Sequence, residues 1–296
     1  MYYRYYQVAG ITIRVNSDLE ITDTTFAPKF KLFEVKEPGD DIIVINHHFD
    51  LPEFNAEHFG KIIYDQSPWI IYENDGFYTY ILLTSPEPDD DRVNQIMFCN
   101  KDYSEITVYN NDMYTEGFKK GHKGALTLNP TDQIILAQVL SRRDGCYFHS
   151  DGMIIDGNGY LFVGHSGAGK STIATMLQDK GEILCDDRMI IRKLDSEYKI
   201  YGNWSHGTLP IVSASSTHLK AIFFLNQSEK NLIEPVNKTM DKVKTLISCM
   251  VKPLNSDKWW NSSIDLIEDI AIKIPCYNLF FNKNGEIYEE IISLKL

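Results

Sequence analysis

The chain has 296 residues, of which 43% are hydrophobic, so it can bury the core of one large domain or of two. Its formal net charge of −12 argues against general nucleic-acid binding and against an anionic membrane surface, because basic residues recognise both partners. The five cysteines form no C-x-x-C pair, which predicts reduced thiols. The lack of a signal peptide or of a long apolar run predicts a cytoplasmic protein.

Residues 1–111 are rich in β-branched and aromatic residues, a composition typical of strands. An Asn-Asp-Gly step at residues 74–76, between two apolar runs, predicts a hairpin turn. We interpret this half as an antiparallel β domain without catalytic residues. Its aromatic residues are expected to serve packing, because no basic residues are interleaved with them as in a nucleic-acid stacking platform. The expected strands cover residues 11–15, 42–45, 61–64, 69–72, 76–83 and 106–109.

Residues 110–124 contain few apolar side chains and are the expected linker between two domains, 1–124 and 125–296. In the second domain, strands and helices alternate too sparsely for a standard doubly wound sheet. This pattern predicts an α/β domain with α+β character that relies on hairpins. Its expected helices cover residues 131–143, 172–180, 240–250 and 259–272. Its expected strands cover residues 146–155, 160–163, 182–185, 189–193, 198–201 and 219–225, followed by a last hairpin of residues 277–281 and 287–292.

The most specific feature of the chain is residues 164–171, which read Gly-His-Ser-Gly-Ala-Gly-Lys-Ser and match the P-loop pattern G-x-x-x-x-G-K-[ST]. An expected strand precedes this segment and an expected helix follows it. Glycines let successive N–H groups converge on phosphate oxygens, and the helix adds its positive end. A glycine-rich turn without a ligand is the alternative, but the full pattern in this context predicts nucleotide phosphate binding. The expected binding residues are Gly164, Ser166, Gly167, Ala168, Gly169, Lys170, Ser171 and Thr172.

Three further groups fit the chemistry of a bound nucleotide. Lys170 can reach the β- and γ-phosphates, and the Ser171 hydroxyl can bind Mg²⁺. Asp186 and Asp187 follow an apolar run one helix downstream, where an aspartate of P-loop proteins often holds Mg²⁺. Adjacent strand residues point to opposite sides, so both aspartates serve one site only if the strand ends at the pair. In isolation, such a pair is more often a solvated turn.

His149 lies in the expected strand before the P-loop strand, and it comes near the phosphate site if the two strands are neighbours. A histidine in such a position is more often structural than catalytic. The remaining candidates each have a plausible structural role. His165 in the P-loop is expected to point away, and His206 and Gly207 lie in a loop that could cover a substrate. Arg188 and Arg192 could neutralise phosphate or lie on an exposed hairpin.

Between residues 149 and 187, a histidine-bearing strand, a P-loop, a helix that ends in Lys-Gly and a strand that leads to Asp-Asp follow one another. This order resembles the C-terminal catalytic domain of HPr kinase/phosphorylase, a P-loop fold shared with phosphoenolpyruvate carboxykinase. His149 precedes Lys170 by the interval seen in that family. The resemblance covers roughly residues 130–292, and residues 6–14, 220–225 and 274–277 look like a divergent branch of HPr-kinase-like proteins that often serve peptide-modification systems.

The resemblance implies a role for each matched residue. Lys170 would bind phosphates, Ser171 would bind Mg²⁺, Asp187 would take the proton from the acceptor hydroxyl, and His149 would be an accessory residue near the phosphates. We assign Asp186 to Mg²⁺ as well. The chain departs from the family in four respects: its P-loop ends in Lys-Ser-Thr where HPr kinases have Lys-Ser-Glu, the interval from Gly181 to the aspartates is one residue shorter, and neither a second acidic metal ligand nor the C-terminal Pro-Gly-Arg-Asn signature is found. HPr itself and the reverse phosphorylase activity are therefore doubtful.

The expected function is that of an ATP- and Mg²⁺-dependent kinase that transfers the γ-phosphoryl group to a hydroxyl, with a serine of a peptide or protein as the expected acceptor. The alternative is a nucleotide-binding regulatory or scaffold module, whose β domain binds a partner and whose site turns over slowly or never. A carboxykinase acting on a dicarboxylate is disfavoured, because no Lys/His metal set or arginine cluster is seen. No nucleic-acid or membrane partner is expected, and a homo-oligomer is left open.

Overall fold

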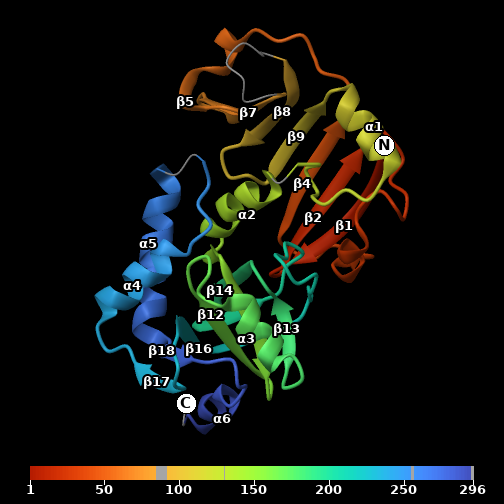
Figure 1. Cartoon of the computed structure of the whole chain (residues 1–296). Helices are drawn as coiled ribbons and strands as arrows, with labels where there is room; N and C mark the ends of the chain where they lie inside the picture. The colour runs from red at the N-terminus through yellow and green to blue at the C-terminus, as the bar shows by residue number, and fades with distance from the viewer. Residues whose placement is uncertain (85–91, 130, 255–256, 295–296) are drawn as a thin grey trace. The chain divides into compact units, whose positions relative to one another are not determined.

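The structure is a computed structural model that describes residues 1–84, 92–129, 131–254 and 257–294 (Figure 1). It has a mixed α/β fold, and the chain divides into two compact units. Unit 1 comprises Met1–Val139 with Pro253–Ser256, and unit 2 comprises Leu140–Lys252 with Asp257–Leu296. The division falls within a helix, α2 (Thr131–Ser141), and the domain limits 1–124 and 125–296 remain a prediction.

Unit 1 is built on one nine-stranded sheet, counted over the residues that the structure describes. Its strands are β1 (Tyr2–Val8), β2 (Ile11–Ser17), β3 (Glu34–Val35), β4 (Ile42–His48), β5 (Lys61–Gln66), β6 (Trp69–Glu73), β7 (Phe77–Leu83), β8 (Val93–Asn100) and β9 (Glu105–Asn110), with short 3-10 helices η1 (Pro28–Leu32) and η2 (Ala56–Phe59). The hairpin expected at residues 74–76 joins β6 to β7. However, β2 pairs with β4, and β4 with β9, in parallel, so the prediction of a purely antiparallel domain is wrong. Parallel neighbours need long crossover connections, which local turn signals do not reveal.

The segment of residues 110–124, the expected linker, contains helix α1 (Asp112–Lys120). The side chain of Asn111 caps the N-terminus of this helix. Phe118 is buried and packs edge-on against the ring of Phe26. A single buried aromatic residue in an otherwise polar segment is a weak sequence signal, which explains why the helix was not predicted.

The negative charge of the chain is concentrated in its first half. Residues 1–139 contain 22 Asp and Glu against 11 Lys and Arg, a net charge of −11, whereas residues 140–296 contain 19 against 18, a net charge of −1. Composition alone could place the charge anywhere along the chain. The uneven division means that the electrostatic properties of unit 1 differ from those of unit 2.

Unit 2 is built on a second nine-stranded sheet, again within the described part of the chain. Its strands are β10 (Gly145–Phe148), β11 (Ser150–Ile155), β12 (Asn158–Val163), β13 (Glu182–Cys185), β14 (Met189–Leu194), β15 (Glu197–Tyr201), β16 (Ser216–Gln227), β17 (Leu232–Pro235) and β18 (Cys276–Phe281). Their order is β10-β14-β15-β16-β12-β11-β13, with β18 paired to β16 and β17 paired to β18. Because β12, β16 and β18 run parallel, their carboxyl ends meet at one edge of the sheet. The glycine-rich segment begins at this edge.

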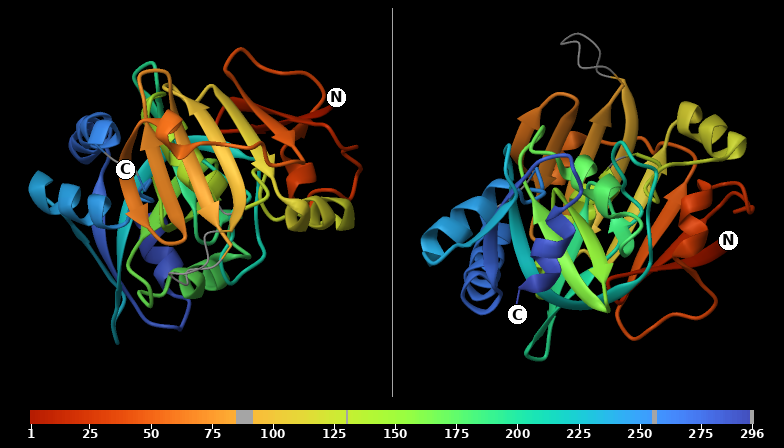
Figure 2. Two further views of the ribbon diagram at one scale, coloured as in Figure 1. Left: turned by 90° about the horizontal axis from the view of Figure 1, so that it is seen from above. Right: turned by 60° about the horizontal axis from the view of Figure 1, so that its bottom comes forward.

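Helices cover both faces of this sheet (Figure 1). Helices α3 (Lys170–Leu177) and α6 (Ile287–Ser293) pack on one face. Helices α4 (Thr239–Ser248) and α5 (Asp257–Lys273), which lie side by side (Figure 2), pack on the other. On β12, Phe162 joins the apolar cluster of α3, and Val163 joins that of α4 and α5. Burial from both sides explains the continuous apolar run of this strand. None of the helices in the described ranges has the length and apolar composition that a membrane crossing requires.

Two expected elements of the second half are wrong. The strand expected over residues 146–155 is broken at His149 into β10 and β11, which pair with different neighbours. The strand expected over residues 287–292 is helix α6, whose Ile287 and Ile291 are buried one turn apart. The structure confirms the other main elements of this half, which are the helices expected near residues 172–180, 240–250 and 259–272, the hairpin of residues 189–193 and 198–201, and the strand at 219–225.

Candidate functional site

Residues 164–169 connect β12 to α3 in a tight loop. Gly167 and Gly169 have φ angles of +82° and +101°, in the left-handed region that favours glycine. A Cβ atom on Gly169 would lie 2.7 Å from Cζ of Phe281, and one on Gly164 would lie 2.6 Å from a side chain of the same loop. The path of the backbone therefore requires all three glycines of the motif.

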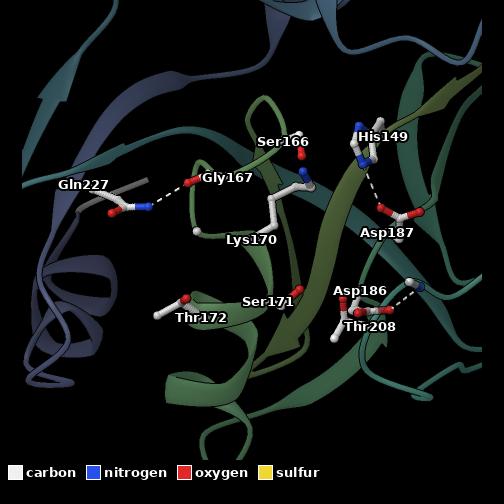
Figure 3. Close-up of a pocket in the computed structure, with 12 residues that line it drawn as sticks. His149, Ser166, Gly167, Lys170, Ser171, Thr172, Asp186, Asp187, Thr208 and Gln227 are labelled. Carbon is white, nitrogen blue, oxygen red and sulfur yellow. Dashed lines mark hydrogen bonds and ion pairs between the residues drawn. The ribbon is translucent and has the colours of Figure 1, made fainter.

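The loop borders a pocket of about 330 Å³ that lies within unit 2 (Figure 3). This volume is in the range of small-molecule sites. Gly164 and Ala168, which were expected to bind phosphate, shape the loop without lining the pocket. The lining residues are His149, Ser166, Gly167, Gly169, Lys170, Ser171, Thr172, Asp186, Asp187, Gly207, Thr208 and Gln227. The pocket thus combines the loop, the start of α3, the ends of β13 and β16, and the break after β10.

Two side chains hold the loop through its carbonyl groups. Lys170 is only 8% exposed, and its Nζ donates to Gly164 O at 3.1 Å and to His165 O at 3.4 Å. From the opposite side, Nε2 of Gln227 donates to Gly167 O at 2.6 Å (Figure 3). Gln227 was not predicted, because a glutamine at a strand end belongs to no motif. These contacts keep the lysine amine inside the loop, where a bound anion would compete with the two carbonyl oxygens.

Asp187 makes close contacts with two basic side chains. Its Oδ1 lies 2.7 Å from Nε2 of His149, and its Oδ2 lies 2.5 Å from Nη1 of Arg188. Burial acts to raise the pKa of Asp187, but the hydrogen bond with His149 and the charges of Arg188 and Lys170 outweigh burial and lower this pKa below its ordinary value. Asp187 is therefore an ionised carboxylate at neutral pH, and its orientation is fixed from both sides.

The break between β10 and β11 brings His149 to this pocket. The backbone N–H of His149 donates to Cys249 O at 2.7 Å, and that of Ser150 donates to Asp187 O at 3.2 Å. Both bonds lie outside the strand ladders. His149 therefore lines the same pocket as the glycine loop, although it lies between two strands and not within one, as the sequence suggested.

Asp186 binds the backbone of a covering loop. Strand β13 ends at Cys185, which allows both aspartates to line one pocket. Asp186 is 1% exposed, and its two carboxylate oxygens accept hydrogen bonds from Gly207 N at 2.7 Å and Leu209 N at 2.6 Å. Figure 3 shows this carboxylate near Thr208, which also lines the pocket. These bonds hold the loop after β15 against the aspartate pair.

The remaining candidates contribute less to this pocket. Gly207 lines it, and a Cβ at this position would lie 2.8 Å from Cβ of Asp187. The neighbouring His206 and the exposed His165 do not belong to its lining. Arg192 is buried and donates through Nε to a backbone carbonyl at 3.1 Å, so its proposed place on an exposed hairpin is wrong, and it does not line the pocket.

A third carboxyl group, that of Asp151, lies close to this pocket and was not predicted. Asp151 is fully buried, and neither of its side-chain oxygens has a hydrogen-bond partner. Burial, together with the negative charge of Asp186, raises the pKa of Asp151 well above its ordinary value, and the charge of Lys170 opposes this shift. The only sequence signal is an acidic residue that interrupts an apolar strand two positions after His149.

The pocket offers oxygen ligands of the kind that Mg²⁺ prefers. Magnesium in nucleotide sites is held by one or two carboxylates together with phosphates and water. The hydroxyl of Ser171 and the carboxylate of Asp186 line the same pocket from α3 and from the end of β13 (Figure 3). Across the described ranges, no group of three or more His, Cys, Asp or Glu residues forms a metal cluster. The Ser171 hydroxyl and the Asp186 carboxylate are ligands of the kind that fit a cation held together with a polyphosphate.

A model of the family described as SynChlorMet cassette protein ScmC matches residues 125–294, more than half of the chain. The chain belongs to this family. The match includes every residue that lines the pocket. The ScmC family is a different family from the HPr kinases that the sequence resembles.

Other comparisons with this ScmC-family chain are weaker. No curated protein matches it. Among solved structures, it is similar to the HPr(Ser) kinase/phosphatase from Coxiella burnetii, with 12% identity, coverage of 49% of this chain and 90% of that chain, and a TM-score of 0.30.

Proposed function

We propose that this ScmC-family chain is an ATP-dependent phosphotransferase that moves the γ-phosphoryl group to a hydroxyl of a peptide or protein, with serine as the expected acceptor. One observation carries the proposal: a single pocket contains the glycine loop, a lysine and a hydroxyl at a helix start, and two carboxylates at a strand end. These groups correspond to the separate requirements of phosphoryl transfer, which are to bind the polyphosphate, hold a cation and accept a proton.

Binding of the polyphosphate is assigned to the loop and the first turn of α3. The N–H groups at a helix start and the helix dipole both favour an anion there. Lys170 would exchange its bonds to Gly164 O and His165 O for bonds to the β- and γ-phosphates. Because the amine is already held inside the loop, little of its side-chain entropy would be lost on binding.

Mg²⁺ is assigned to Ser171 and Asp186. Each carboxylate oxygen of Asp186 accepts one backbone hydrogen bond and retains capacity for another ligand. The cation would offset the negative charge of the phosphate oxygens.

Asp187 is the proposed general base. It is ionised at neutral pH, because the hydrogen bond with His149 and the neighbouring positive charges keep its pKa low despite burial. A base with a low pKa suits phosphoryl transfer, in which positioning and electrostatic stabilisation contribute most of the rate. The acceptor hydroxyl must come within hydrogen-bond reach of this carboxylate. His149 and Arg188 would hold the base in position.

Single-turnover phosphorylation tests the proposal. Protein in excess over γ-labelled ATP and Mg²⁺ is mixed with serine-containing peptides, and labelled peptide is followed with time. Asp187→Asn removes the base, and Asp179→Asn is the matched control, because Asp179 is exposed just beyond α3. We expect transfer by the wild type and the control, and at least about a hundredfold slower transfer by Asp187→Asn. Undiminished transfer by Asp187→Asn would remove the base assignment.

The second candidate function is a nucleotide-binding scaffold that recruits a partner and turns over slowly or never. The charge of −11 on residues 1–139, against −1 on residues 140–296, favours a partner-binding role for unit 1. Saturable ATP binding without transfer to any peptide, and without ATP hydrolysis, would support the scaffold over the kinase.

A further inference from the structure

Asp151 lies at the edge of the sheet that borders the pocket. On β11 it pairs with Phe162, the residue before the last of β12. The next residue, Gly152, pairs with Cys185, the last residue of β13. Continuing this antiparallel ladder by one step places Asp151 across from Asp186. Asp151 thus lies between the strand that feeds the glycine loop and the strand that leads to the aspartate pair.

The side chain of Asp151 is on the α3 face of the sheet. Side chains alternate along a strand, so Asp151 shares its face with Met153. Met153 belongs to the apolar cluster that contains Ile173 of α3. Asp151 pairs with Phe162 and Met153 with Tyr160, so Asp151 is nearer the loop end of β12. Lys170, the first residue of α3, is among the charges that act on Asp151.

This carboxyl group lacks any partner that would explain it structurally. Asp151 is fully buried, and both of its oxygens are without a hydrogen bond. Of the buried polar side-chain atoms without a partner in the described residues, those of Asp151 are the only carboxylate oxygens. A buried acid is costly unless it is paired, hydrogen-bonded or bound to a metal. The arrangement therefore points to a positive ligand that binds at this position.

Lys170 does not act as the missing partner. Its Nζ donates to two backbone carbonyls of the loop. Lys170 influences the pKa of Asp151 only as a neighbouring charge, and the nearby carboxylates Asp186 and Asp187 act in the opposite direction. Arg188 is paired with Asp187, and Nζ of Lys170 is bonded to the loop, so the charge of Asp186 still disfavours an ionised Asp151. A divalent cation between these two carboxyl groups would compensate their repulsion.

We propose that Asp151 is the second carboxylate of the divalent-cation site and that it acts with Asp186 and Ser171 on the cation or on its water ligands. This inference rests on the proposed function, because that cation accompanies the nucleotide. Asp151 would be the second acidic ligand of the cation, for which the P-loop and the aspartate pair offer no candidate. Two carboxylates and a hydroxyl suit Mg²⁺, which keeps several water and phosphate ligands.

Binding of Mn²⁺, a spectroscopic substitute for Mg²⁺, tests the inference without any need for turnover. Free Mn²⁺ is measured by electron paramagnetic resonance during titration of the full chain with a non-hydrolysable ATP analogue present. Asp151→Asn is compared with Asp156→Asn, which removes the same charge from an exposed position at the other end of β11. Nucleotide binding in EDTA and the thermal unfolding midpoint without metal are measured for each variant.

We expect Asp151→Asn to weaken Mn²⁺ binding by about tenfold or more and Asp156→Asn to leave it unchanged. Nucleotide binding in EDTA should be the same in both, and the unfolding midpoint of Asp151→Asn should equal or exceed that of the wild type, because an unpaired buried acid is removed. Equal Mn²⁺ affinity in the two variants would overturn the inference. So would a lower midpoint with loss of nucleotide binding in EDTA, since both indicate a structural role.

A second variant and a second readout keep the test decisive. If Asp151→Asn does not fold, the smaller Asp151→Ser is titrated in its place, and unchanged Mn²⁺ affinity in that variant overturns the inference. Failure of the wild type to phosphorylate any peptide counts against the proposed function alone, because the Mn²⁺ titration with the bound analogue is independent of transfer.

Discussion

Nε2 of His149 lies 2.7 Å from Oδ1 of Asp187, although the two residues are far apart in the sequence. The first stands at a break between two strands, and the second stands just after another strand. Their contact lines the pocket that also contains the glycine loop. His149 therefore acts on the proposed base Asp187 by holding it and by keeping its pKa low.

Replacing His149 tests this positioning role. His149→Ala should lower kcat for phosphoryl transfer by about tenfold to a hundredfold, with a smaller effect on KM for ATP. Loss of the hydrogen bond should also raise the pKa of Asp187, so the fall in rate on the acid side of the pH profile should move to higher pH. His206→Ala is the control, because His206 does not line the pocket. An unchanged pH profile in His149→Ala would contradict the role.

The glycine loop can be tested with two matched substitutions. Gly157 and Gly169 have φ angles of +79° and +101°, but a Cβ on Gly157 meets open space, whereas one on Gly169 would lie 2.7 Å from Phe281. Gly157→Ala should cost about 1 kcal/mol in the free energy of unfolding, from backbone strain alone. Gly169→Ala should cost more and should also abolish nucleotide binding. Denaturant unfolding and ATP titration measure the two effects. Equal free energies of unfolding and equal ATP affinities in the two variants would refute this account of the loop.

Unit 1 contains a buried histidine that predicts acid sensitivity. Nε2 of His47 lies 2.8 Å from Leu126 O, and burial lowers the pKa of His47 from 6.5 to about 4 despite this hydrogen bond. Between these values the unfolded chain binds a proton that the folded chain does not, so stability falls as the pH is lowered through this window. The loss is roughly 3 kcal/mol for a shift of this size.

Replacement of the histidine tests this dependence. His47→Gln should flatten the fall in the free energy of unfolding between pH 6.5 and about 4, and the exposed His58→Gln should not. Urea unfolding at a series of pH values measures the slope. A slope that is identical in both variants would assign the acid sensitivity to other groups.

The charge division makes the proposed partner site on unit 1 testable. With a net charge of −11 on residues 1–139, binding of a cationic peptide should weaken strongly between low and high salt. Peptides of one length and different net charge, titrated at several salt concentrations, provide the test. We expect the affinity to increase with the positive charge of the peptide and this increase to disappear at high salt. Affinity that is independent of both peptide charge and salt contradicts an electrostatic partner site.

The sequence was most informative where structure is local. A fixed spacing of glycines and Lys170 indicated the loop, and the apolar run before Asp186 indicated the strand end. Parallel pairing of β2 with β4 was not predictable, because it depends on a crossover and not on a turn. Helix α6 was missed, because the short run that contains Ile287 and Ile291 fits either a strand or a helix.

The candidate site was also predictable only in part, because long-range strand pairing places some of its residues. The motif residues can be recognised from their spacing in the sequence. Gln227 and Asp151 are instead placed at the pocket region by the pairing of strands in the sheet. Nothing in a single sequence shows that β11 lies between β12 and β13, or that the strand expected over residues 146–155 breaks at His149. Long-range pairing therefore supplied the parts of the site that spacing did not.

The most direct test of the account is whether Lys170 and its loop bind a polyphosphate. Calorimetric titration of ATP with Mg²⁺ should show one saturable site in the wild type and at least about tenfold weaker binding in Lys170→Gln. Lys180→Gln is the control, because Lys180 is exposed beyond the far end of α3 and should leave the affinity unchanged. If the wild type does not bind ATP, or if Lys170→Gln binds it as tightly as the wild type, the central claim is wrong.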